Sequence, residues 1–214
     1  MDDRQERVRA HATEGVVWSR LAGLLPGAED VNQVQGCWDI GEQEGGLSYL
    51  VDRLFALGLS VDDVTRAELA AMASQWGVWD QLATDIVDLP GAQGKVRVVE
   101  GLEPVDRDGM ALVPWMRCER CGRILALEHR HEAWGGLSFM PVSYVVSVPD
   151  DVGTPLVFDA EGPDAVWRAL AALTATCREA AATEGGQTRT PQEQPCPIAA
   201  DASSAPSRSR PRPR

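Results

Sequence analysis

The sequence lacks the long apolar segments that a membrane or a secretion pathway requires. No apolar run approaches the ~20 residues of a membrane-spanning helix, and the first ten residues, MDDRQERVRA, hold six charged side chains and no apolar leader. We therefore expect a cytoplasmic protein without a membrane partner. The five cysteines are an odd number, and in a reducing cytoplasm we expect thiols instead of a disulfide framework.

Motifs for catalysis and nucleotide binding are also missing. The sequence has no G-x-S-x-G, no glycine-rich phosphate loop before a helix and no H-E-x-x-H, and it contains only three histidines. These absences favour a protein that binds over one that catalyses, so we predict no enzymatic activity. An enzyme whose site assembles only in three dimensions stays open as an alternative, which a deep pocket with convergent polar groups would favour.

Positive charge is scarce. The 214 residues contain 20 Lys+Arg against 32 Asp+Glu, a formal net charge of -12, and residues 1–100 hold 17 of the acidic and 8 of the basic side chains. A surface with this excess repels phosphate backbones and attracts basic proteins. The charge therefore argues against a nucleic-acid partner and for a basic protein partner, although a general role in solubility explains the same excess.

The hydrophobic periodicity changes near residue 94. Apolar side chains in residues 1–90 recur at helical spacing, whereas residues 94–182 contain alternating segments, clearest over 142–148, before a closing helical stripe. We therefore predict an α+β fold, in which an N-terminal helical half is followed by a mostly antiparallel sheet with a C-terminal helix. Residues 183–214 are rich in proline and have no aromatic residue, which predicts a disordered tail. Whether the two structured regions share one core stays open.

Two local patterns concern helix starts and turns. Thr65 and Glu68 have the spacing of a capping box, which predicts that a helix opens at Thr65. The pairs Gly45-Gly46 and Gly135-Gly136 are interpreted as turn elements, because glycine adopts turn conformations without steric cost.

Cys118 and Cys121 form the sharpest chemical motif. They enclose a short turn between two predicted strands, and two thiolates at this spacing can bind one zinc ion. A closed zinc site needs four ligands, and His129 and His131 lie about 26 Å or more along a regular strand from the thiolates. Zinc bound through Cys118 and Cys121 therefore stays an alternative to a purely structural turn, and a redox role is a weaker one.

The densest local group of carboxylates lies between two predicted helices. It consists of Asp39, Glu42, Glu44 and Asp52, for which we predict contacts with the basic partner, the alternative being a solvated acidic face. The seven tryptophans are expected mostly in the core, and an exposed pair among them would indicate an interface.

Residues 31–77, which include the run DIGEQEGGLSYLVDRLFALGLSVDDVTRAELAAMASQWG, resemble the MafI-like immunity proteins of bacterial toxin systems. The matching positions are Gly41-Glu42, Leu47, Leu50, Leu54, Leu59-Ser60, Leu69 and Gly77. The resemblance implies a helical protein that neutralises a partner toxin by occluding it, without chemistry of its own. Our first hypothesis is therefore an acidic binding protein, an immunity protein that covers a basic toxin. The alternative is a zinc-knuckle regulatory or interaction protein that uses Cys118 and Cys121.

Overall fold

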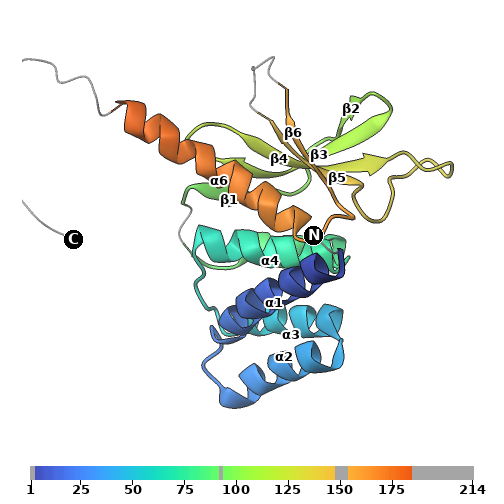
Figure 1. The fold of residues 1–214 in the computed structure, drawn as a ribbon. Helices are drawn as coiled ribbons and strands as arrows, with labels where there is room; N and C mark the ends of the chain where they lie inside the picture. The colour runs from blue at the N-terminus through green and yellow to red at the C-terminus, as the bar shows by residue number, and fades with distance from the viewer. Residues whose placement is uncertain (1–2, 92–93, 148–153, 185–214) are drawn as a thin grey trace, which may run out of the picture.

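The computed structural model describes residues 3–91, 94–147 and 154–184, and Figure 1 shows their arrangement. The helices and strands follow in the order α1 (Asp3–Ala22), α2 (Ala28–Ile40), α3 (Gln43–Ala56), α4 (Asp63–Gln75), α5 (Trp79–Asp88), β1 (Val96–Val98), β2 (Val105–Arg107), β3 (Met110–Cys118), β4 (Ile124–Arg130), β5 (Ser143–Ser147), β6 (Leu156–Asp159) and α6 (Ala165–Glu184). This order confirms the predicted α+β fold. Apart from its first two positions, which end α6, the predicted tail lies outside the described residues. Among the described residues, no helix combines the length and the apolar character needed to cross a membrane.

The strands form one antiparallel sheet in the order β1-β3-β4-β5-β6, and β2 pairs with the start of β3. The long strands β3 and β4 are adjacent, with Val113 opposite Leu127 and Met116 opposite Leu125. Their register shifts between Pro114 and Met116. The sequence did not predict β2, because all three of its residues are exposed and its side chains therefore show no alternation of burial.

Helix α4 lies in the middle of the molecule. It contacts α1 and α3 on one side and β1 and α6 on the other, as Figure 1 shows. Four buried alanines occupy much of its surface: Ala67, Ala70, Ala71 and Ala73. Small side chains let neighbouring elements approach closely on both sides of a helix, which explains how α4 can be covered by helices and by the sheet.

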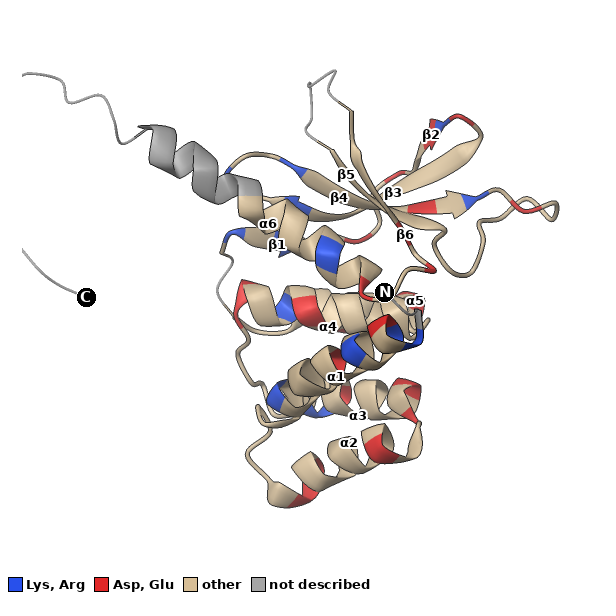
Figure 2. Ribbon diagram, viewed as in Figure 1, with Lys and Arg blue, Asp and Glu red and all other residues tan. Residues whose placement is uncertain are grey.

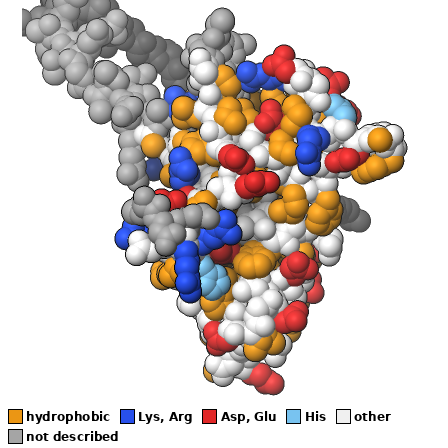
Figure 3. Space-filling model, turned by 45° about the vertical axis from the view of Figure 1, so that its right-hand side comes forward, with side chains coloured by type: hydrophobic (Ala, Val, Ile, Leu, Met, Phe, Trp, Pro, Cys, Tyr) orange, Lys and Arg blue, Asp and Glu red, His pale blue; other side chains and the backbone are white. Residues whose placement is uncertain are grey.

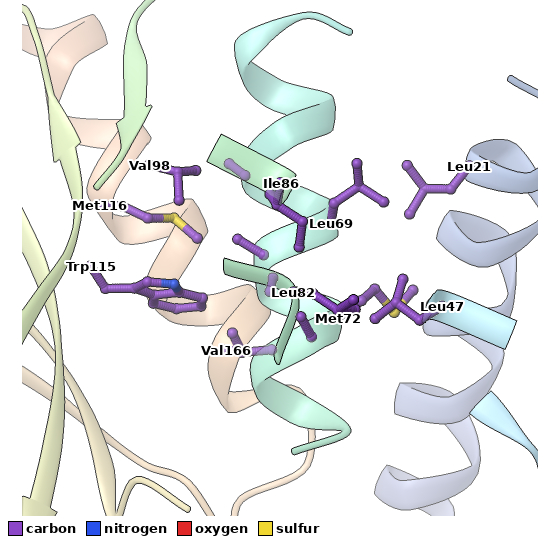
Figure 4. Close-up of a cluster of buried hydrophobic side chains, with 14 of the residues drawn as sticks. Leu21, Leu47, Leu69, Met72, Leu82, Ile86, Val98, Trp115, Met116 and Val166 are labelled. Carbon is purple, nitrogen blue, oxygen red and sulfur yellow. The ribbon is translucent and has the colours of Figure 1, made fainter. Parts of the chain in front are cut away.

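The buried apolar side chains form one cluster that includes both halves of the chain. Figure 4 shows Trp115 and Met116 from the sheet on one side of it, Leu69 and Met72 of α4 in the middle, and Leu47 of α3 beyond them. The predicted helical region and the predicted β-rich region therefore share a continuous core.

Two local predictions were wrong. Helix α4 begins one turn earlier than the capping-box spacing indicated, because Asp62 is the N-cap and its Oδ1 accepts a 2.7 Å hydrogen bond from the backbone N–H of Thr65. Hydrogen bonding by Thr65 also holds the pKa of Asp62 below its usual range. Gly45 and Gly46 are not turn residues but belong to the first turn of α3.

Candidate functional site

The four predicted contact carboxylates lie on one helical hairpin, formed by α2 and α3 and called here the acidic hairpin (residues 28–57). Asp39 is near the end of α2, Glu42 is the N-cap of α3, and Glu44 and Asp52 lie eight residues apart within α3. Eight residues are slightly more than two helical turns, so Glu44 and Asp52 share one face about 12 Å apart. The structure thus brings three of the four together at the α2–α3 turn, with Asp52 further along the same hairpin.

All four of these side chains are exposed to solvent. Within the described chain none of them forms an ion pair, and the one hydrogen bond is from Gln35 Nε2 to Asp39 Oδ1 at 3.4 Å. Helix α2 carries no basic residue, and Figure 2 shows the acidic positions at the ends of α2 and α3. Their negative charge is therefore directed to solvent and not neutralised by neighbouring side chains.

Exposed apolar side chains accompany these carboxylates. Ile40, between Asp39 and the turn, is 75% exposed, and Phe55, one turn beyond Asp52, is 49% exposed. On the face shown in Figure 3, acidic and hydrophobic side chains lie next to one another over the lower, helical end of the molecule. A mixture of apolar and charged groups is typical of protein–protein interfaces.

A different carboxylate, Asp30, holds the hairpin together. Arg53 donates to it twice, from Nη2 to Oδ2 at 2.9 Å and from Nε to Oδ1 at 3.1 Å, and the Tyr49 hydroxyl donates to Oδ1 at 2.6 Å. The hydrogen bonds from Arg53, and then that from Tyr49, hold the pKa of Asp30 below its usual range. Asp30 therefore fixes α2 against α3 and is not part of the unpaired acidic surface.

The acidic hairpin is packed tightly against α1. The indole Nε1 of Trp18 donates to the carbonyl of Val34 at 3.1 Å, and the ring of His11 stacks on Trp38 with 4.6 Å between centroids. Gly46 allows the close approach, because a Cβ at this position would lie 2.8 Å from the ring of Trp18 in α1. The exposed carboxylates are thus presented on a supported surface.

A cleft of about 820 Å³ opens beside the acidic hairpin, between α1 and the start of α6, and is called here the α1–α6 cleft. It is also lined by the end of α4 and by the segment that leads into β5. Its charged lining residues are the carboxylates Glu14, Asp159, Glu161 and Asp164 and the arginines Arg7 and Arg130. His11 lines the cleft as well as stacking on Trp38, so the cleft and the hairpin adjoin there.

Glu14 is the most buried of these carboxylates, with 3% of its surface exposed. Gln75 Nε2 donates to its Oε2 at 2.9 Å, and the indole Nε1 of Trp76 donates to its Oε1. Burial raises the pKa of Glu14, while the hydrogen bond from Trp76, the nearby His11 and the hydrogen bond from Gln75 act in the opposite direction. Among the described residues, Glu14 has no cation in ion-pair contact.

Glu14 was not among the predicted site residues, although its position in the sequence contains a signal. Glu14 precedes Trp18 by four residues and Leu21 by seven, so it lies on the face of α1 that both buried residues occupy. A carboxylate on an apolar helical face needs a partner or a special function. His11, one turn before Glu14 on α1, is exposed instead.

The cysteine motif forms the tight turn that its spacing predicted. The backbone N–H of Gly122 donates to the carbonyl of Cys118 at 2.8 Å, and that of Cys118 donates to Arg123 at 2.8 Å. Cys118 is buried in the core opposite Val96, whereas Cys121 is half-buried. The motif supplies two thiols, and the described part of the chain contains no cluster of three or more His, Cys, Asp or Glu that could hold a metal ion.

The two histidines of β4 and its extension have other partners. His129 Nδ1 donates to the carbonyl of Ser138 at 2.8 Å, and His131 Nε2 donates to Oδ1 of Asp106 at 2.8 Å. Both lie at the end of the sheet opposite the cysteine turn, because Ile124 begins β4 beside that turn. The structure therefore does not bring the histidines and the thiols together.

The tryptophans do not form an exposed pair. Only Trp134 among the seven is exposed, at 75%, on the turn between β4 and β5. Gly135 there has a φ of 91°, which confirms the turn predicted for this glycine pair. Phe139, on the same connection, is also exposed.

Comparison with protein-family models, curated proteins and solved structures finds no match to this chain.

Proposed function

We propose that this protein is a non-enzymatic binding protein of the cytoplasm that presents the acidic hairpin to a basic protein partner. The observation that carries the proposal is the state of Asp39, Glu42, Glu44 and Asp52: all four are exposed, on one supported hairpin, without an ion pair among the described residues. Unpaired charges on one face attract and orient a partner of opposite charge. The exposed Ile40 and Phe55 supply apolar contact area next to them.

The partner class we propose is a bacterial toxin, which the protein would neutralise as an immunity protein by covering its surface. Two lines of argument support this class: the resemblance of residues 31–77 to MafI-like immunity proteins, and the basic surface that a partner of this hairpin needs. A toxin that acts on nucleic acid has such a basic surface. Occlusion requires only binding, which agrees with the absence of catalytic motifs from the sequence.

The zinc-knuckle alternative has less support. It needs two further ligands for the pair Cys118 and Cys121, and Cys118 faces the apolar core. We therefore base the proposed function on the acidic hairpin.

The proposal is tested with the purified product of the adjacent gene, by isothermal titration at about 0.05 M and about 0.5 M salt, since higher salt screens exposed charges. We expect saturable binding that weakens with salt. Removing all four charges, in D39N/E42Q/E44Q/D52N, should weaken binding at low salt by about tenfold or more.

The control removes four exposed carboxylates from the sheet side: E100Q/E103Q/D108N/E119Q. Its net charge equals that of the hairpin variant, so it separates a local contact from a general effect of charge. Equal weakening by both variants would contradict the proposed contact surface. Absence of binding at both salt concentrations would contradict the proposal that the product of the adjacent gene is the partner.

A further inference from the structure

The α1–α6 cleft has a property that the acidic hairpin does not explain. Its buried carboxylate, Glu14, is hydrogen-bonded only by the neutral donors of Gln75 and Trp76. A buried carboxylate without a cation is costly, because neutral hydrogen bonds replace only part of its hydration. Arg7 and Arg130 line the same cleft, but neither forms an ion pair with Glu14.

A second polar atom beside Glu14 also needs a donor. Gln75 uses its amide N–H for Glu14, and its carbonyl Oε1 is buried with no hydrogen-bond partner among the described residues. Buried acceptors without a donor are rare in folded proteins and call for an explanation. On two hydrogen-bonded residues, the lining of the cleft therefore contains a carboxylate with no ion pair among the described residues and an acceptor without a donor. The imidazole of His11, which also lines the cleft, is near enough to lower the pKa of Glu14, but it makes no ion pair with it among the described residues.

The opposite wall adds negative charge. Asp159 ends β6, and Glu161 and Asp164 lie on the turn into α6. All three are exposed and, in the described residues, without an ion pair. With Glu14 they outnumber the two arginines of the lining by four to two. The indole of Trp76 adds an aromatic surface, to which a cation is also attracted.

We propose that the α1–α6 cleft binds an alkylguanidinium group, with Glu14 as its counter-charge. A guanidinium is planar, stays charged and carries five N–H donors, so it can serve a carboxylate and a neighbouring carbonyl at once. The volume of about 820 Å³ is in the range of small-molecule sites and leaves room for the chain that carries the group. The same group occurs in free metabolites and in arginine side chains of proteins.

The experiment uses the isolated full chain and two guanidinium probes, so it does not depend on the partner of the acidic hairpin. Agmatine represents a free ligand, and N-acetyl-arginine methylamide represents an arginine within a peptide chain. The corresponding citrulline amide has the same shape without the charge. Binding is followed by titration calorimetry and by the indole N–H resonance of Trp76, assigned with W76F.

We expect saturable binding of at least one guanidinium probe at about 1 mM or below, a plausible affinity for so small a ligand, and a shift of the Trp76 resonance. The citrulline amide should bind at least tenfold more weakly. If only agmatine binds, the site takes a free ligand; if the arginine amide also binds, the site accepts an arginine side chain.

Glu14→Gln should weaken binding of the probe at least tenfold, because a neutral amide replaces the counter-charge. Glu103→Gln, which removes an exposed carboxylate of the sheet side, should leave it within twofold. Thermal unfolding followed by circular dichroism checks that both variants are folded. The variant E161Q/D164N tests the exposed wall of the cleft, and we expect it to weaken binding of the probe about threefold. No saturable binding of either probe, or equal affinity in Glu14→Gln, would overturn the proposal.

Discussion

The carboxylates of Glu14 and Asp52 are chemically alike, but they differ in burial and therefore in the cost of keeping them charged. Asp52 is exposed to solvent, so its charge costs little to maintain and acts on molecules that approach the surface. Glu14 has lost most of its water and has only neutral donors in contact. Its charge is therefore maintained at a cost, which a bound cation would relieve.

This difference predicts the pH dependence of a Glu14→Gln variant. Because the pKa of Glu14 is raised in the folded state, the wild-type protein loses stability as the pH rises from 4.5, the ordinary value, through the raised one. The glutamine has no such loss, and a rotated Gln75 amide can accept from it. At about pH 8 we expect Glu14→Gln to have a free energy of unfolding about 1 kcal/mol above that of the wild type.

Denaturant unfolding of both proteins between about pH 4 and about pH 8 measures this difference. It should shrink towards zero as the pH falls below the ordinary glutamate value, where Glu14 becomes protonated in both states. Asp52→Asn serves as the exposed reference. A Glu14→Gln variant that is less stable at every pH would show that the charge of Glu14 is already compensated within the protein.

At the scale of the elements, the acidic hairpin shows how two adjacent glycines differ. Both Gly45 and Gly46 lie in the first turn of α3. A Cβ at Gly45 would meet nothing within 4 Å, whereas one at Gly46 would lie 2.6 Å from the Cβ of Cys37 and 2.8 Å from the Trp18 ring. Only Gly46 is required by packing, and it sets the distance of α3 from α1 and α2.

Alanine substitutions at the two positions should therefore have opposite effects. Gly45→Ala should raise the free energy of unfolding by about 0.5 kcal/mol, because alanine favours the helix more than glycine does. Gly46→Ala should lower it by about 1–3 kcal/mol through overpacking. Urea unfolding gives both values, and each variant is the control of the other. Equal effects would mean that α3 can shift away from α1 and α2 at little cost.

The residues that carry the resemblance to MafI-like immunity proteins have structural roles in these elements. Leu47, Leu50 and Leu54 are fully buried in α3, and Gly41 and Gly77 have positive φ values at the ends of α2 and α4. Such residues specify how the helices end and pack. Recognition of a particular partner would instead depend on the exposed side chains between them.

At the scale of the whole molecule, the core predicts cooperative unfolding. Buried side chains of the helices and of the sheet form one cluster around α4, so neither half has a separate apolar core. We expect a single calorimetric transition for the full chain, with equal calorimetric and van't Hoff enthalpies. Leu125→Ala, a sheet substitution at a fully buried position, should lower the free energy of unfolding by about 2–5 kcal/mol.

Two probes measured on Leu125→Ala test the shared core. Far-UV circular dichroism, which is dominated by the helices, and near-UV circular dichroism of the tryptophans should shift to the same lower midpoint. A helical signal that keeps the wild-type midpoint while the sheet unfolds would indicate two independent units.

The sequence alone determined the order of the main helices and most strands and the exposure of the four hairpin carboxylates. These features depend on local periodicity and on residues close in sequence, so they can be predicted without knowledge of the tertiary contacts. It did not determine the burial of Glu14, because its partners Gln75 and Trp76 lie 61 and 62 residues away on another helix. Which layers cover α4, and which charges end in a cleft, was decided only by tertiary packing, since burial is a property of the neighbours that the fold brings to a residue.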